Sequence, residues 1–91
     1  MAATQQNREL PVSFSSFIVS LATSAMMHMG EGPDPGGQST QAELDLARQT
    51  IDVLGLLRDK TEGNLDDDEA KLLEALLYET RMKYMEKTGS G

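Results

Sequence analysis

The stretch from Leu10 to Gly30 contains no aspartate, glutamate, lysine or arginine, although 25% of the whole chain is charged. Its apolar residues recur with helical spacing, so we expect one short helix over residues 14–29. Apolar side chains cover roughly 200° of this helix, more than a single packing face needs. The excess apolar surface predicts a protein that associates with another molecule, most simply with a second copy of itself.

The 91 residues are enough for one domain at most. Polar residues precede Ser13 and small residues follow Lys87, so we predict tails over 1–12 and 88–91 around a single domain over 13–87. A core of this size is marginal without disulfides, a metal or oligomerisation. The chain has no cysteine, which excludes disulfides and thiolate metal sites and is compatible with a cytoplasmic location.

The net charge of −7 and the sequence pI near 4.5 give the chain an acidic surface. Nucleic acids and anionic membrane surfaces attract basic patches, which this chain lacks, and we predict no nucleic-acid partner. The chain has no tryptophan and only four aromatic residues in all. We therefore also predict no surface on which nucleic-acid bases stack.

Two other interpretations of the uncharged stretch are a targeting segment and a membrane-spanning helix. Arg8 before an apolar run resembles the start of a signal peptide, but Glu9 cancels its charge and several serines dilute the run. A helix over 14–29 would be about 24 Å long, shorter than the roughly 30 Å hydrocarbon core of a bilayer. We therefore predict no integral membrane span and a cytoplasmic protein.

Two further helices begin at capping boxes. Thr40 and Glu43 have the spacing in which each side chain accepts a hydrogen bond from the other residue's backbone amide, and this predicts a helix over 41–62 that Gly63 closes. Asp66 and Glu69 have the same spacing and predict a helix over 67–87. Acidic residues at the start of this last helix and basic residues at its end both favour the helix dipole.

These patterns predict an all-α fold of three helices. The last two form an antiparallel hairpin, the first packs across them, and oligomerisation completes the core. Gly55 lies inside the second helix at the edge of its apolar face, where glycine costs about 1 kcal/mol. Close approach of another backbone is the interpretation we favour for it.

An ordered set of motifs runs from Phe14 to Met85 and resembles a small bacterial family. The motifs are Ser20–Ala25, Met29–Glu31, Pro33–Pro35, Leu46–Asp52 with Leu54, Lys60–Leu65 and Leu76–Met82. The chain is similar to the family catalogued as domain of unknown function eighteen-forty-four. The resemblance implies a short, helical bacterial protein and implies no particular activity, cofactor or partner.

His28 is the single histidine and the strongest candidate for site chemistry. A packed, hydrogen-bonded histidine near a helix end is the simpler interpretation. The alternative uses Glu31 and Asp34 with His28 as ligands of a divalent ion, although the spacing matches no standard site. Ser24 lies one turn before His28, but no orienting group or oxyanion hole is apparent, so we predict no catalytic residues and no cofactor.

The leading hypothesis is a homodimeric, non-enzymatic protein-interaction module. Methionines adapt to irregular contacts and favour this interpretation. The predicted interface residues are Phe17, Leu21, Met26, Met29, Leu56, Tyr78, Met82 and Met85. A second protein could occupy the same surface as a second copy. Two other hypotheses remain: a small-ligand or metal-binding protein built around His28, and a peripheral membrane protein that uses the first helix.

Overall fold

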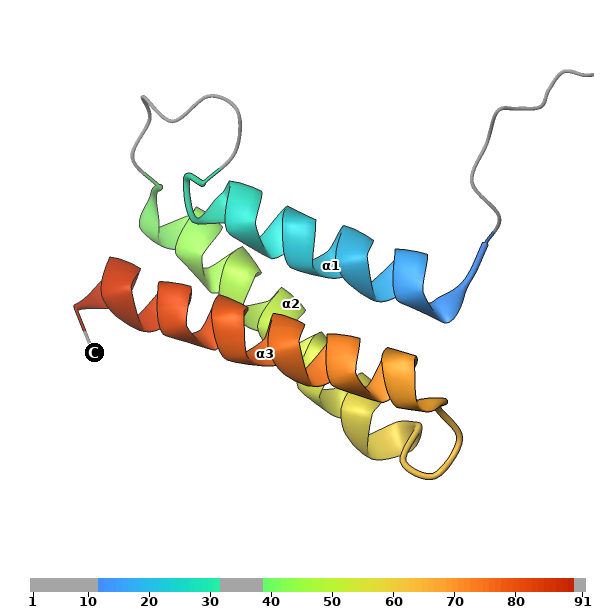
Figure 1. The fold of residues 1–91 in the computed structure, drawn as a ribbon. Coiled ribbons are helices and arrows are strands. Elements are labelled where there is room, and N and C mark those ends of the chain that lie inside the picture. The colour runs from blue at the N-terminus through green and yellow to red at the C-terminus, as the bar shows by residue number, and fades with distance from the viewer. Residues whose placement is uncertain (1–11, 32–38, 90–91) are drawn as a thin grey trace, which may run out of the picture.

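The computed structural model describes residues 12–31 and 39–89, which form three α-helices (Figure 1). These are α1 (Phe14–His28), α2 (Gln41–Lys60) and α3 (Asp67–Thr88). The predicted all-α, three-helix fold is confirmed, and each predicted helix end lies within two residues of the observed one. Over the described ranges the chain has no β-strand, and no helix there has the length and apolarity needed to cross a membrane.

The starts of α2 and α3 are the two predicted capping boxes. The amide of Glu43 donates to the Thr40 hydroxyl over 3.1 Å, and the amide of Thr40 donates to the Glu43 carboxylate over 3.1 Å. Asp66 and Glu69 exchange the same two bonds at 2.8 and 3.0 Å. These bonds use backbone donors that a helix start otherwise leaves unpaired, so local sequence alone sets where each helix begins.

The start of α1 is a third capping box, made by two serines. Ser13 is the N-cap, and its hydroxyl accepts from the Ser16 amide over 3.0 Å. The Ser16 hydroxyl in turn accepts from the Ser13 amide over 3.1 Å. Serine replaces the usual glutamate or glutamine at the third helical position, which allows α1 to begin without any charged residue.

The chain direction alternates along the sequence, so that α1 and α3 run one way and α2 runs back between them (Figure 1). A turn over residues 61–65 joins α2 to α3 as the predicted antiparallel hairpin, and Gly63 in this turn has a φ of 86°. All three pairs of helices are in contact. The predicted packing of the first helix against the other two is therefore confirmed.

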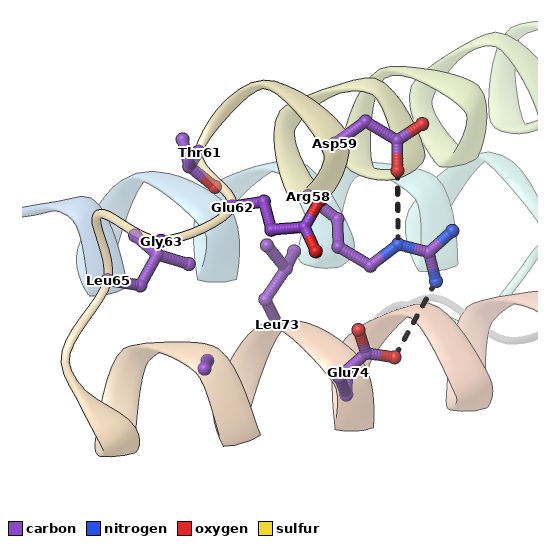
Figure 2. A pocket seen from close by; sticks show the side chains of 9 residues that line it. Arg58, Asp59, Thr61, Glu62, Gly63, Leu65, Leu73 and Glu74 are labelled. Carbon is purple, nitrogen blue, oxygen red and sulfur yellow. Dashed lines mark ion pairs between the residues drawn. The ribbon is translucent and has the colours of Figure 1, made fainter.

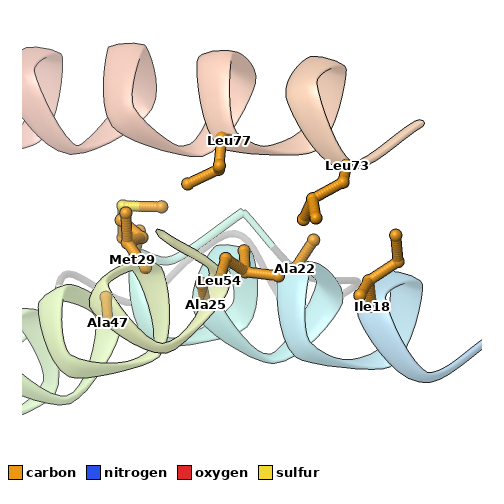
Figure 3. Close-up of a cluster of buried hydrophobic side chains, with 9 residues drawn as sticks. Ile18, Ala22, Ala25, Met29, Ala47, Leu54, Leu73 and Leu77 are labelled. Carbon is orange, nitrogen blue, oxygen red and sulfur yellow. The ribbon is translucent and has the colours of Figure 1, made fainter. Parts of the chain in front are cut away.

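The core lies where the three helices meet, and small residues allow α1 and α2 to approach closely (Figure 3). Its buried apolar residues are Ile18, Ala22, Ala25, Met29, Ala47, Ile51, Leu54, Leu73 and Leu77. Three of these nine residues are alanines, so each helix contributes only a small volume of apolar side chains to the core. Partly buried residues such as Leu57 and Tyr84 close it from outside.

The C-terminal end of α3 extends one residue beyond the predicted tail boundary. Thr88 is helical, and its hydroxyl donates to the Tyr84 carbonyl over 2.9 Å. Gly89 then ends the helix with a φ of 74°. The predicted tail residues 1–11 and 90–91 lie outside the described ranges.

Gly55 is buried in α2, and a side chain rather than a backbone lies against it. A Cβ atom placed at Gly55 would come 3.1 Å from Nη2 of Arg81 on α3. The expectation of close backbone approach is corrected accordingly, because an Arg81 guanidinium covers this position.

We expect Gly55→Ala to stabilise the protein by about 0.5–1 kcal/mol, since alanine is the better helix former and the end of Arg81 can move by a few tenths of an ångström. Chemical denaturation measures the change, and Arg81→Ala provides the background in which the gain should persist. A loss of stability that Arg81→Ala relieves would show instead that Arg81 is held rigidly.

Candidate interaction surface

Ten large apolar side chains in the described part of the chain keep more than a third of their surface exposed. They are Val12, Phe17, Val19, Met27, Leu46, Val53, Leu56, Tyr78, Met82 and Met85. All three helices contribute to this set, so the excess apolar surface is not confined to α1. What distinguishes the helices is the charge that surrounds these side chains.

The outer face of α1 carries a hollow surface with little charge. One hollow on α1 itself is lined by Val19, Ser20, Thr23, Ser24, Met27 and His28. A second hollow between α1 and α3 is lined by Val19, Ala22, Thr23, Met26, Met27, Glu31, Leu76, Glu79 and Thr80. The two share Val19, Thr23 and Met27, and we call the area around these three residues the α1 surface. Its carboxylates are those of Glu31 and Glu79.

Thr80 of α3 lies beneath the second hollow and is 0% exposed. Its hydroxyl donates to the Leu76 carbonyl over 2.8 Å and lies 3.2 Å from the Leu77 carbonyl. The hydrogen bond is therefore made within α3, and the buried hydroxyl does not need a partner from α1. The sequence pattern did not predict that Thr80 is buried, because a threonine among charged neighbours is typical of a surface position.

The predicted interface residues of the first helix fall in different places. Met29 is 1% exposed and belongs to the core, so its assignment to the interface is corrected. It is the C-cap residue of α1 and continues the helical spacing of the buried residues Ala22 and Ala25. Leu21 and Met26 are partly buried against the core, whereas Phe17 is exposed. Val19 and Met27, which the prediction omitted, are exposed on the α1 surface.

The predicted residues Tyr78, Met82 and Met85 are exposed on α3, as is Leu56 on α2. At 100° per residue, Tyr78 and Met85 lie about 60° or less from Arg81, which contacts α2 at Gly55. The residues of α3 that face α1 are on the other side of the helix. The predicted interface residues therefore lie on separate surfaces. The apolar stripe of α3, formed by Tyr78, Met82 and Met85, is not continuous with the α1 surface.

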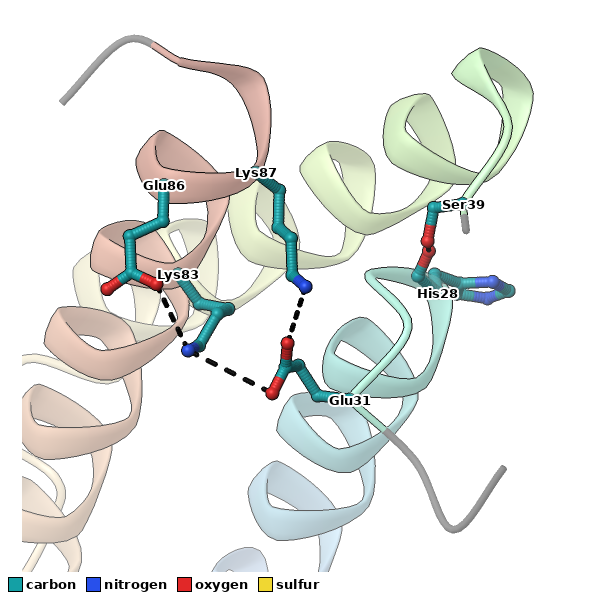
Figure 4. A network of polar contacts seen from close by, with 6 residues as sticks. All are labelled: His28, Glu31, Ser39, Lys83, Glu86 and Lys87. Atoms are coloured by element: carbon teal, nitrogen blue, oxygen red, sulfur yellow. Dashed lines mark hydrogen bonds and ion pairs between the residues drawn. The ribbon is translucent and has the colours of Figure 1, made fainter. Parts of the chain in front are cut away.

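Glu31 connects the end of α1 to the end of α3 (Figure 4). Gly30, at φ 82°, closes α1 with a Schellman motif in which the Glu31 amide donates to the Met26 carbonyl over 2.9 Å. This turn places the Glu31 carboxylate 2.7 Å from the Lys87 ammonium and 3.9 Å from that of Lys83. The negative charge at the edge of the α1 surface is thus neutralised by two lysines.

Lys83 completes this ionic cluster through Glu86, whose carboxylate is 3.2 Å from the Lys83 ammonium. The hydrogen bond to Glu86, followed by the charge of Glu31, raises the pKa of Lys83 above its usual 10.5. The hydrogen bond from Lys87 is the main reason that the pKa of Glu31 lies below its usual 4.5. Glu31 and Lys83 are therefore both ionised near neutral pH.

A comparison with protein families found a match over most of the chain. The family model described as domain of unknown function DUF1844 matches residues 11–86. The chain belongs to this family. The match confirms the resemblance drawn from the sequence motifs, and it covers all three helices apart from the last two residues of α3. The searches of curated proteins and of solved structures found no significant match.

In this DUF1844 protein the Glu31 cluster predicts a specific dependence of stability on pH. Because folding lowers the pKa of Glu31, the ionised carboxylate stabilises the fold above pH 4.5, and this contribution is lost as the pH falls through the folded pKa. We expect Glu31→Gln to lower the melting temperature at pH 7 and to have a progressively smaller effect below pH 4.5.

The control for this prediction is Glu62→Gln, which removes one carboxylate at the turn between α2 and α3. Melting curves of the three proteins from pH 3 to pH 7, recorded by circular dichroism, provide the comparison. A Glu31→Gln deficit that is as large at pH 3 as at pH 7 would contradict the assigned ion pair.

The structure does not bring the predicted metal ligands together. The His28 imidazole points away from the Glu31 carboxylate (Figure 4), and that carboxylate is held by lysines. Asp34 lies outside the described residues. Within residues 12–31 and 39–89 no three histidine, aspartate or glutamate side chains are grouped so that they could hold a metal ion. The Ser39 hydroxyl instead donates to the His28 carbonyl, which ties the start of α2 to the end of α1.

A separate cavity of about 260 Å³ lies beside the turn between α2 and α3 (Figure 2). Arg58 crosses it, with nitrogen atoms 3.6 Å from the carboxylates of Asp59 and Glu74. Exposed pairs of this kind contribute roughly 0–1 kcal/mol. Neither an imidazole nor a thiol is among the residues that line the cavity. The Arg58–Glu74 pair connects α2 to α3 at this cavity.

Proposed function

We propose that this DUF1844 protein is a small non-enzymatic interaction module that self-associates as a homodimer. The observation that carries the proposal is the α1 surface, where exposed apolar side chains lie on a helix without any charged residue. Water-exposed apolar surface of this kind favours a protein–protein contact. The small core supports the same conclusion, because a contact between copies would add apolar burial that a 91-residue chain lacks.

The proposal is tested by the solution mass of the protein, measured by light scattering on a sizing column. One chain has a mass of 9.9 kDa, and the measurement should cover a hundredfold range of concentration. We expect about twice the chain mass at the upper end, and a fall toward the chain mass only on dilution. A monomer throughout the range, up to high micromolar concentration, would overturn the proposal.

The other two hypotheses receive less support from the geometry. A metal or ligand site around His28 would have to displace the lysines from Glu31, and a titration with divalent ions before and after His28→Ala tests for it. An interfacial membrane helix usually presents basic residues beside its apolar face, whereas α1 presents Ser20, Thr23 and Ser24. Flotation with neutral and anionic liposomes tests that alternative.

A further inference from the structure

We infer that the second copy docks on the α1 surface, with the two α1 helices antiparallel about a two-fold axis at Thr23. This inference rests on the homodimer proposed above and specifies where and in which register the two copies meet. Three features of the described residues carry it: the charge of the chain, the residues opposite each other across such an axis, and the charges around the competing surface on α3.

The charge of the chain restricts which faces of two copies can meet. Each copy carries a net charge of −7, so most contacts between copies bring like charges together. The hollows of the α1 surface include the carboxylates of only two residues, Glu31 and Glu79. Glu31 is already paired with Lys83 and Lys87. The α1 surface is thus a face where the electrostatic cost of self-association is small.

A two-fold axis at Thr23 gives a self-complementary contact. In an antiparallel pair about this axis, residues equally far before and after Thr23 face each other, so Met27 meets Val19 of the second copy and Val19 meets its Met27. Met27 is 55% exposed and Val19 is 42% exposed, and both line the hollows on either side of Thr23. The small Thr23 and Ser20 side chains allow the helices to approach, and the flexible methionine fills the remaining space.

The apolar stripe of α3 is a poorer surface for self-association. Met82 lies at its centre, and Glu79 and Glu86 are one helical turn before and after Met82 on the same side of the helix. A symmetric contact through Met82 would bring four carboxylates of the two copies close together. Glu86 is already paired with Lys83, so the cost of such a contact falls on the two Glu79 carboxylates, because a charge that leaves water must be paired.

The first experiment compares two methionine-to-glutamate variants by light scattering over the same concentrations as the native protein. Met27→Glu places two new charges at the contact, and we expect the dimer dissociation constant to rise about tenfold or more. Met82→Glu makes the same substitution on a side chain that is 42% exposed, and should leave the dimer unchanged. Thermal melts confirm that both variants fold. Dissociation by Met82→Glu but not by Met27→Glu would overturn the inference.

The second experiment tests the register with single cysteines, which report unambiguously because the chain has none. A residue on a two-fold axis is the one position that meets its own copy, so we expect Thr23→Cys to form a disulfide-linked dimer when oxidised with diamide. Met82→Cys is the control and should stay uncrosslinked. A native dimer in which Thr23→Cys fails to crosslink would overturn this register alone, whereas a native monomer would overturn the proposed function itself.

Discussion

Replacing Leu54 with alanine is expected to lower the free energy of unfolding by about 2–5 kcal/mol. Leu54 is a fully buried residue of α2, in a core that draws on all three helices. The substitution removes apolar burial and leaves a cavity that the few other large core side chains cannot fill. Because a domain of this size is stable by about 5–15 kcal/mol, the loss should be evident in urea denaturation at fixed protein concentration.

Leu56→Ala is the matched control, since it makes the same change two residues away on the same helix. Leu56 is 55% exposed, so we expect a change within about 0.5 kcal/mol. Equal effects of the two substitutions would contradict the orientation of α2. A Leu56→Ala protein that folds normally but loses its dimer would instead place the contact between copies on α2.

Replacing Ala47 with leucine is expected to lower the free energy of unfolding by about 1–3 kcal/mol, although leucine is more apolar. Ala47 is 0% exposed and belongs to the same core cluster as Ala25 and Met29 (Figure 3). A larger side chain there must push α1 and α2 apart or adopt a strained rotamer. Urea denaturation measures the loss.

Ala42→Leu is the corresponding control on the exposed first turn of α2. Both residues are alanines in the same helix, so differences in helix propensity cancel. We expect Ala42→Leu to leave the free energy of unfolding within about 0.5 kcal/mol of the native value. If Ala47→Leu were equally harmless, the close approach of α1 to α2 would be refuted.

The helix starts could be predicted from sequence because each is encoded by residues three apart. The end of α2 was harder, since it depends on competing local contacts. Gly63 suggested a helix that continues to residue 62, but the Thr61 hydroxyl donates to the Leu57 carbonyl over 2.7 Å. The Thr61 carbonyl then accepts from the Asn64 amide over 2.8 Å and forms the turn. The helix therefore ends at Lys60.

The candidate surface could be predicted only as a property of the first helix as a whole. The sequence placed Met29 on the wide apolar arc of the first helix and Met27 among its small uncharged residues, but an uncharged helix has no polar face to indicate which part of that arc meets water. Met29 is buried because it continues the helical spacing of the core residues Ala22 and Ala25, whereas Met27 lies about 160° away around the helix and is exposed. The pairing of Glu31 with Lys83 and Lys87 joins residues more than 50 positions apart, and helical periodicity carries no information about such contacts.

The two contacts that flank residues 32–38 have a consequence for how this protein can be engineered. Glu31 is held by Lys87, and Ser39 is held by the His28 carbonyl, so both ends of this connection are fixed by groups outside it. The free-energy cost of closing such a connection rises by only about 0.6 kcal/mol when its length doubles. An epitope or a fluorescent reporter can therefore be inserted between the first two helices without separating them.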